Sequence, residues 1–86
     1  MNIVFHSLAF DQYVEWQRID RTLLVKINRL IAECQRHPFE GTGKPEPLRG
    51  DYSGWWSRRI DREHRLVYRV SGNVLEIAQC RYHYQG

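Results

Sequence analysis

A regular hydrophobic pattern covers residues 20–36 and predicts the clearest helix in the chain. Its apolar face consists of Leu23, Ile27, Leu30, Ile31 and Cys34, which recur at helical spacing. Asp20 precedes this face and is placed to cap the first helical turn. The residue before Pro38 is pushed out of the helical region, so the helix should end near Arg36.

A second helical pattern precedes it and runs from residue 7 to about Arg18. The residues that mark one face of this helix are Phe10, Tyr13, Val14 and Gln17. Ser7 can cap its first turn, and the tight junction at Ile19-Asp20 indicates that the two helices form an antiparallel hairpin. The short apolar run at residues 2–6 is expected to be an edge strand or a buried strand.

Strand patterns dominate the second half of the chain, over residues 55–60, 65–70 and 74–84. The segment Ser71-Gly72-Asn73 between the last two strands is a strong hairpin signal. The middle strand alternates between two sets of side chains. The first set is Leu66, Tyr68 and Val70, and the second set is Arg65, Val67 and Arg69. This strand should therefore have a core face and a basic face.

The last strand alternates less cleanly. Its odd positions are Leu75, Ile77, Gln79, Arg81 and His83, and its even positions are Val74, Glu76, Ala78, Cys80, Tyr82 and Tyr84. The small apolar Ala78 and Cys80 suit packing under the helices, which would put Arg81 and His83 on the open face beside Arg65. The apolar residues at the first two odd positions contradict this assignment. One explanation is an open face that is apolar at one end and polar at the other, as in a cleft.

These patterns predict an α+β fold in a single domain, residues 1–86. An N-terminal strand and a helical hairpin should pack on one face of a mainly antiparallel sheet, whose other face is left for function. Residues 37–54 carry all three prolines and four of the six glycines, and they are expected to form an ordered loop. The first residues resemble neither a signal peptide nor a membrane span, so a cytoplasmic protein without a membrane partner is expected.

Charge and composition favour a nucleic-acid partner. The formal net charge is +3, and eleven of the thirteen basic residues are Arg. Arg binds phosphate through a planar fork and also stacks on bases. High-GC codon usage is an alternative source of the Arg excess. It does not explain why seven of them fall in the second half: Arg49, Arg58, Arg59, Arg62, Arg65, Arg69 and Arg81.

The two cysteines, Cys34 and Cys80, both lie in apolar patterns and are expected to be reduced core residues. The chain has no Cys/His spacing typical of zinc. We therefore expect neither a metal nor another cofactor.

The candidate chemistry is cleavage of RNA, because cutting a phosphodiester needs a base, an acid and positive charge near the phosphorane. The 2′-hydroxyl of RNA is a built-in nucleophile, so no metal is required. Glu46, between two prolines, is a candidate base, His83 a candidate acid, and Arg65 a candidate stabiliser of the phosphorane. The alternatives are a solvated glutamate, an inert histidine, and an arginine that pairs with Glu63 or Glu76.

Other residues near these candidates carry weaker signals. Tyr84 could stack on a base or hydrogen-bond the phosphate, whereas Tyr82 is expected in the core. Arg58 and Arg59 should point to opposite faces of their strand, and Arg59 is a candidate substrate contact. His64 is expected to be structural. Of the pair Trp55-Trp56, one residue is expected in the core and the other at an interface.

Four segments occur in a fixed order along the chain: Pro38 to Leu48, Ser53 to Ile60, Glu63 to Tyr68, and Cys80 to Tyr84. Together they resemble the corresponding segments of the YoeB toxins, a branch of the RelE superfamily. The likeness is collinear over nearly the whole chain. It implies a microbial-ribonuclease-like fold, a homodimer, and cleavage of mRNA in the A site of the 70S ribosome. It also implies neutralisation by a YefM-like antitoxin, whose C-terminal segment we expect to be acidic.

The resemblance also implies site residues. The catalytic positions of the family match Glu46, Arg65, His83 and Tyr84, and a basic position that is commonly Lys in the family is Arg49 here. A second interpretation stays open, in which the chain is a non-catalytic scaffold that binds nucleic acid or an antitoxin. The trio of carboxylate, guanidinium and imidazole favours the enzyme.

Overall fold

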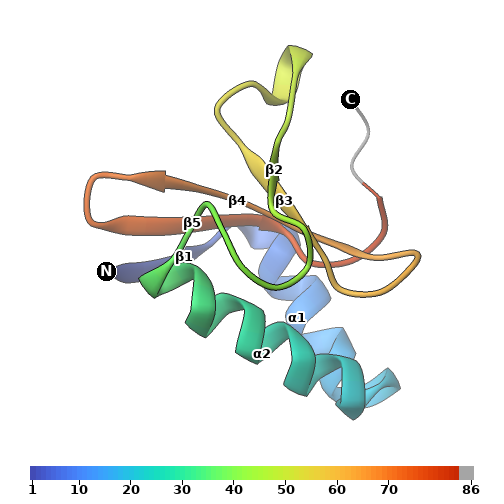
Figure 1. The fold of residues 1–86 in the computed structure, drawn as a ribbon. Coiled ribbons are helices and arrows are strands. Elements are labelled where there is room, and N and C mark those ends of the chain that lie inside the picture. The colour runs from blue at the N-terminus through green and yellow to red at the C-terminus, as the bar shows by residue number, and fades with distance from the viewer. Residues whose placement is uncertain (84–86) are drawn as a thin grey trace.

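Two helices cover one face of a five-stranded sheet (Figure 1). The computed structural model describes residues 1–83. Helix α1 spans Ser7–Ile19 and helix α2 spans Arg21–Arg36. Asp20 alone separates them, and its carboxylate accepts a hydrogen bond from the Leu23 N–H at 3.1 Å. The expected hairpin and the Asp20 cap are therefore confirmed.

The sequence assigned the buried face of α2 correctly but not that of α1. Four of the five predicted residues of α2 are buried, and the fifth packs against the core. In α1 the buried residues are Ala9, Gln12 and Trp16. Of the predicted face, Tyr13 packs partly against the core, whereas Phe10 and Val14 lie on the exposed side. Apolar residues occur on both sides of α1, so hydrophobicity alone marked the wrong face. Ser7 is the first helical residue and not the cap, a position that His6 occupies.

The sheet has the order β1-β5-β4-β3-β2. Its strands are β1 (Asn2–Phe5), β2 (Glu46–Pro47), β3 (Trp56–Arg59), β4 (Arg65–Ser71) and β5 (Val74–Gln79). β1 is an edge strand parallel to β5, and every other pair is antiparallel. The expected α+β class with a mainly antiparallel sheet is confirmed. The 37–54 loop also contains β2 and a short 3-10 helix, η1 (Gly50–Tyr52), which the sequence did not predict.

A β-bulge explains the irregular pattern of β5. Val67 pairs with Gln79 while its neighbour Tyr68 pairs with Ile77, so Ala78 is an extra residue. Leu75 and Ile77 face the core before the bulge, and Cys80 is buried after it. The assignment of the even positions to the core was therefore wrong at the start of the strand. The strand also ends at Gln79 and not near residue 84 as expected.

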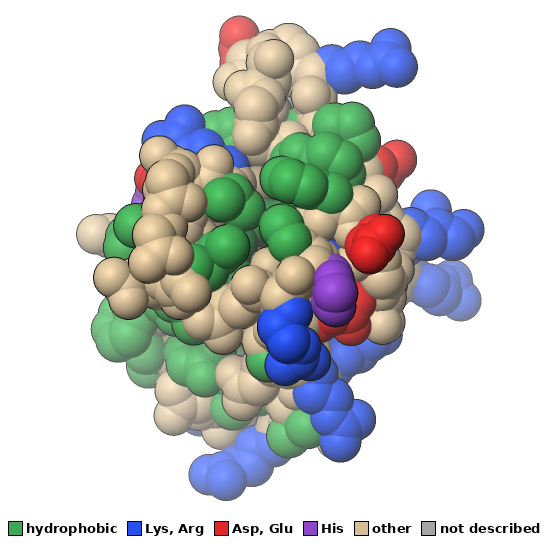
Figure 2. All heavy atoms as spheres, turned by 60° about the vertical axis from the view of Figure 1, so that its left-hand side comes forward, with side chains coloured by type: hydrophobic (Ala, Val, Ile, Leu, Met, Phe, Trp, Pro, Cys, Tyr) green, Lys and Arg blue, Asp and Glu red, His purple; other side chains and the backbone are tan. Residues whose placement is uncertain are grey.

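The core lies between the helices and the sheet. It joins residues of both helices to residues of the sheet and its flanks: Ala9, Trp16, Ile27, Leu30, Ile31, Cys34, Ile60, Leu66, Tyr68, Leu75, Ile77 and Cys80. In the view of Figure 2, apolar side chains also gather in the middle of one surface, and Lys and Arg side chains project around its margin. Among the described residues, neither helix combines the length and the hydrophobicity needed to span a membrane.

Candidate active site

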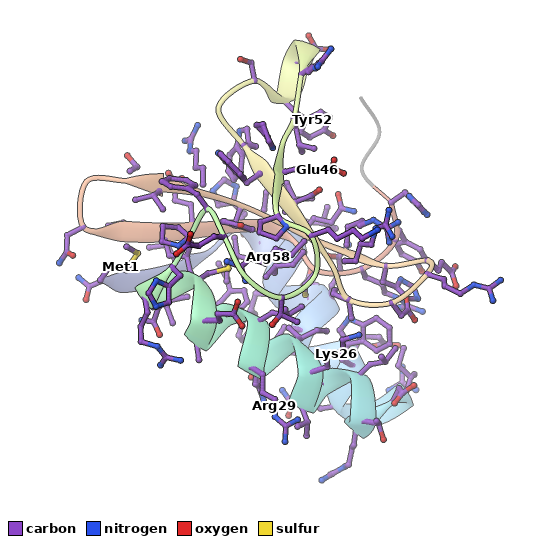
Figure 3. The ribbon with its side chains drawn as sticks, viewed as in Figure 1. Met1, Lys26, Arg29, Glu46, Tyr52 and Arg58 are labelled. Atoms are coloured by element: carbon purple, nitrogen blue, oxygen red, sulfur yellow. The ribbon has the colours of Figure 1, made fainter. Side chains whose placement is uncertain are left out.

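The face of the sheet opposite the helices carries a row of paired residues that runs across four strands. Glu46 pairs with Ser57, Ser57 with Val67, and Val67 with Gln79. Directly paired residues of antiparallel strands present their side chains on the same face. Glu46 stands exposed at the β2 edge, away from the helices (Figure 3). β2 holds this carboxylate on a strand and not on a free loop.

Arg65 and Arg59 form the neighbouring pair of the same face. The Arg65 guanidinium donates from Nη1 to the carbonyls of Asp61 at 2.9 Å and His64 at 3.0 Å. Within residues 1–83 it forms no ion pair, because Glu76 pairs with Arg69 and His6, and Glu63 lies near His64. The alternative of a pair with Glu63 or Glu76 is therefore wrong. Arg65 thus has a guanidinium held by two carbonyls, and no carboxylate of residues 1–83 forms an ion pair with it.

A groove of about 590 Å³ lies beside the two arginines. The residues that line it are Lys26, Thr42, Gly43, Arg59, Asp61, Arg62 and Arg65. Four of these seven residues are cations and one is an acid, so the groove suits an anionic ligand such as a phosphate backbone. Glu46 does not line this groove.

Arg58 faces the opposite way and is fully buried beneath the 37–43 loop (Figure 3). It uses all five of its N–H groups, donating to the Tyr68 hydroxyl, to Glu33 and to three backbone carbonyls, those of His37, Glu40 and Thr42. The Thr42 N–H and then Arg58 lower the pKa of the Glu33 carboxyl below its usual range. The two neighbouring arginines do point to opposite faces, and Arg59 is the one exposed.

His83 follows a short irregular segment after β5 and is exposed. The Tyr82 carbonyl accepts a hydrogen bond from the Arg65 N–H at 3.0 Å, which brings the residue before His83 to the start of β4. Tyr82 has a φ of 65° and is half exposed, so its expected place in the core was wrong. Tyr84 lies outside the described residues.

Two aromatic rings contact Arg81, which does not take its expected place on the open face. Its guanidinium lies 5.4 Å from the centre of the Trp16 ring and 4.7 Å from that of Tyr82. Trp16 belongs to the core side of α1. The bulge at Ala78 and the end of the strand at Gln79 break the alternation on which the expectation depended.

His64 is buried and structural, as expected. Its Nδ1 accepts a hydrogen bond from the Tyr82 N–H at 2.8 Å, and its ring packs edge-on against Trp16 at 4.9 Å. Sequence reasoning missed the link to the C-terminal segment, and it missed Gln79, whose amide donates to the carbonyls of Arg81 and Tyr82. The only sequence signal for this role of Gln79 was its polar side chain at the end of the strand.

Arg49 and the two adjacent tryptophans were also expected to contribute to binding or to the core. Arg49 is exposed and directly precedes η1, which stands out from the sheet (Figure 1). Trp56 packs partly against the core, as expected for one residue of its pair. Trp55 is half-buried and lies under Arg69, whose guanidinium is 4.4 Å from the ring centre. The interface expected for the second Trp stays a prediction.

Both cysteines are free and buried, as expected. Burial raises the pKa of the Cys34 thiol to about 11 and that of the Cys80 thiol to about 12. Within residues 1–83, no three side chains of His, Cys, Asp or Glu gather as a metal-binding group.

The sequence and the fold are similar to those of known bacterial toxins. The family described as "YoeB-like toxin of bacterial type II toxin-antitoxin system" matches residues 5–84. "Toxin YoeB" of Streptomyces coelicolor is 56% identical over 84 residues, which cover 98% of this chain and 100% of that protein. The YoeB/ParE toxin from Agrobacterium tumefaciens has a TM-score of 0.95 at 55% identity, over 98% of this chain and 100% of that one.

YoeB of Staphylococcus aureus has been solved as a dimer and in a heterotetrameric complex with YefM. The TM-scores are 0.91 and 0.90, each at 46% identity over 98% of both chains. These likenesses confirm the expected RelE-like fold.

Proposed function

The chain belongs to the YoeB-like toxins of bacterial type II toxin–antitoxin systems, and from this we propose that it is an endoribonuclease that cuts mRNA in the A site of the 70S ribosome. The observation that carries the proposal is the Arg65 guanidinium, which two carbonyls hold on the sheet face that also bears Glu46 and which has no ion-pair partner among residues 1–83. A fixed cation on the same face as a carboxylate suits a reaction in which negative charge develops on a phosphate.

In the proposed reaction, Glu46 removes the proton of the 2′-hydroxyl, and the 2′-oxygen attacks the adjacent phosphorus. The bond from phosphorus to the 5′-oxygen breaks as His83 donates a proton to that oxygen. Arg65 stabilises the phosphorane that forms between these steps. The products are a 2′,3′-cyclic phosphate and a free 5′-hydroxyl. Since the nucleophile belongs to the RNA, we propose that neither a metal nor another cofactor takes part.

Three further residues are proposed to hold the RNA. Arg59 is exposed in the groove beside Arg65 and suits contact with a neighbouring phosphate. Arg49 is proposed to position phosphate from the loop before η1. By the family resemblance, Tyr84 stacks on a base or hydrogen-bonds the phosphate near the cut.

We propose that this toxin forms a homodimer and is neutralised by a YefM-like antitoxin with an acidic C-terminal segment. The S. aureus relative has been solved in both kinds of assembly. An acidic segment would complement the basic groove, and ordering on binding would hide the groove from RNA. A substrate found on translating ribosomes places the proposed activity in the cytoplasm.

A non-catalytic scaffold that binds nucleic acid or an antitoxin is the second candidate. The basic groove favours it as much as it favours the enzyme, because both need Arg. The two candidates differ in the bond that is broken, so the products discriminate between them.

The test adds the purified protein to translating 70S ribosomes and maps new mRNA ends. We expect cuts inside the A-site codon, with 5′-hydroxyl ends, that persist in excess chelator when Mg²⁺ is kept only at the level that holds the subunits together. A substrate with 2′-deoxyribose at the cut site should resist cleavage. A 5′-phosphate product would refute attack by the 2′-hydroxyl, and intact mRNA on occupied ribosomes would favour the scaffold.

A further inference from the structure

Side chains from other elements hold the irregular backbone between β5 and His83. Around Cys80, Gln12 Oε1 accepts from the Cys80 N–H at 2.8 Å, and Trp16 Nε1 donates to the Cys80 carbonyl at 2.9 Å. Further along, Gln79 Nε2 donates to the carbonyls of Arg81 and Tyr82, at 2.8 and 3.0 Å. The Tyr82 N–H donates to His64 Nδ1 at 2.8 Å. We call this set of four side chains, Gln12, Trp16, His64 and Gln79, the C-terminal clasp.

The clasp compensates for a costly backbone conformation. Tyr82 has a φ of 65°, in the left-handed region that residues with a β-carbon rarely adopt. Such a conformation persists only where the surrounding structure over-determines it, and it is concentrated at functional sites. At Tyr82 both backbone polar groups are bonded, and its carbonyl accepts twice, from Gln79 and from the Arg65 N–H. The conformation is therefore held directly before His83.

The four members of the clasp fall into two pairs. Gln12 and Trp16 are buried in the helix–sheet contact, so they anchor the segment to the core. His64 and Gln79 are the two that bind the backbone of Tyr82.

His64 also links two parts of the proposed site. Its carbonyl accepts a hydrogen bond from the Arg65 guanidinium, and its ring accepts one from the Tyr82 N–H. One residue thus orients both the proposed stabiliser of the phosphorane and the segment that carries the proposed acid.

We propose that His64 and Gln79 are positioning residues, which fix the Tyr82 turn and thereby hold the His83 imidazole beside Arg65. This inference rests on the proposed ribonuclease function. Both residues act through the backbone and do not themselves touch RNA. A displacement of a reacting group by about 1 Å can cost about 10²-fold in rate, so a loose turn would slow the chemical step and leave binding intact.

Gln79→Met is the main test, because it keeps the side-chain size and removes both donors. Gln35→Met is the matched control, since Gln35 is also half-buried and donates to a backbone carbonyl, that of Met1 at 2.9 Å, away from the site. We expect single-turnover cleavage on saturated ribosomes to fall about 10- to 100-fold in Gln79→Met and to stay at the wild-type rate in Gln35→Met. Ribosome affinity and the urea midpoint should match between the two variants.

Two readouts separate positioning from a merely structural role. His83→Gln should cost much less in the Gln79→Met background than in the wild type, because two changes that act through one group are not additive. His64→Asn, which keeps an acceptor near the place of Nδ1, should retain most of the activity that His64→Ala loses. Additive effects of Gln79→Met and His83→Gln, or full cleavage by Gln79→Met, would overturn the proposal.

Hydrogen exchange supplies a readout without RNA. The Tyr82 amide should be protected in the wild type and lose protection in Gln79→Met, while the amides of β4 and β5 stay protected. Unchanged protection at Tyr82 would also overturn the proposal. A wild-type protein that leaves mRNA intact would refute the proposed function itself. An active wild type with an equally active Gln79→Met would refute only the positioning role.

Discussion

At the scale of residues, Arg58 and Arg59 show how adjacent side chains of one type acquire different roles. Arg58 lies under the loop that leads to Glu46, with every N–H bonded inside the protein. Arg59 is exposed in the basic groove. Strand alternation predicted opposite faces for the two residues. It could not tell which face was buried, because that depends on a loop whose path is set by long-range contacts.

Replacing each of these arginines by Met should separate stability from activity. Arg58→Met leaves the carbonyls of three loop residues without this buried donor and removes the ion pair of Glu33, which keeps its hydrogen bond from the Thr42 N–H. We therefore expect a loss of about 3–5 kcal/mol in the free energy of unfolding. Arg59→Met should change stability by less than about 0.5 kcal/mol, as is usual at exposed positions, and should weaken cleavage. Urea titrations of both variants measure the first quantity. Equal destabilisation by the two changes would contradict the proposed stabilising role of the buried Arg58.

The proposed catalytic residues predict defects in the chemical step. Removing a positioned acid or base costs about 10²–10⁴ in rate, so Glu46→Ala and His83→Gln should lower single-turnover cleavage by such factors. Arg65→Ala should cost about 10²–10³. Ribosome affinity should change little in all three variants, whereas Arg49→Ala is expected to weaken binding as well. Near-normal cleavage by both Glu46→Ala and His83→Gln would assign these residues a structural role.

At the scale of elements, regular periodicity was the information that the sequence carried best. The face of α2 and the β4–β5 hairpin follow from local spacing and turn chemistry, and both agree with the structure. The face of α1 and that of β5 do not, because apolar residues lie on both sides of α1 and a bulge at Ala78 shifts the alternation. The same shift explains why the place of Arg81 was wrong. Bulges depend on partner strands, and no local pattern specifies them.

The junction between the helices predicts a measurable capping effect. Asp20 is the only residue between α1 and α2, and its carboxylate satisfies the Leu23 N–H. Asp20→Ala should therefore destabilise the protein by about 1 kcal/mol, and Asn, an equally good cap, should restore most of the loss. Thermal or urea unfolding measures both variants. If Asn were as destabilising as Ala, the carboxylate would matter through its charge and not through the cap.

At the scale of the whole molecule, the two thiols report on global opening. Cys34 comes from α2 and Cys80 from the segment after β5, and both belong to the one core. With burial holding their pKa values at about 11 and about 12, neither thiol ionises near neutral pH. The thiols of the unfolded chain ionise nearer their ordinary pKa of 9.0, whereas the buried thiols stay protonated. The free energy of unfolding should therefore fall as pH rises above that value.

Alkylation at pH 8 should therefore be slow and should follow global unfolding at both sites. We expect Cys34→Ala and Cys80→Ala variants, each with one remaining thiol, to react with the same dependence on urea as their own unfolding transitions. Labelling is read by mass spectrometry. Reaction of Cys80 well below the unfolding midpoint would show that the segment carrying His83 opens on its own.

The place of β5 in the sheet has a consequence for folding during synthesis. Within residues 1–83, β5 is the last strand in sequence order, yet it lies between β1 and β4 and contributes Leu75 and Ile77 to the core. A nascent chain that has not yet exposed β5 lacks the surface on which α1 and β1 pack. We infer that the N-terminal half emerges from the synthesising ribosome as an unfolded, protease-sensitive segment, and that the toxin acquires its fold only after the last strand is free.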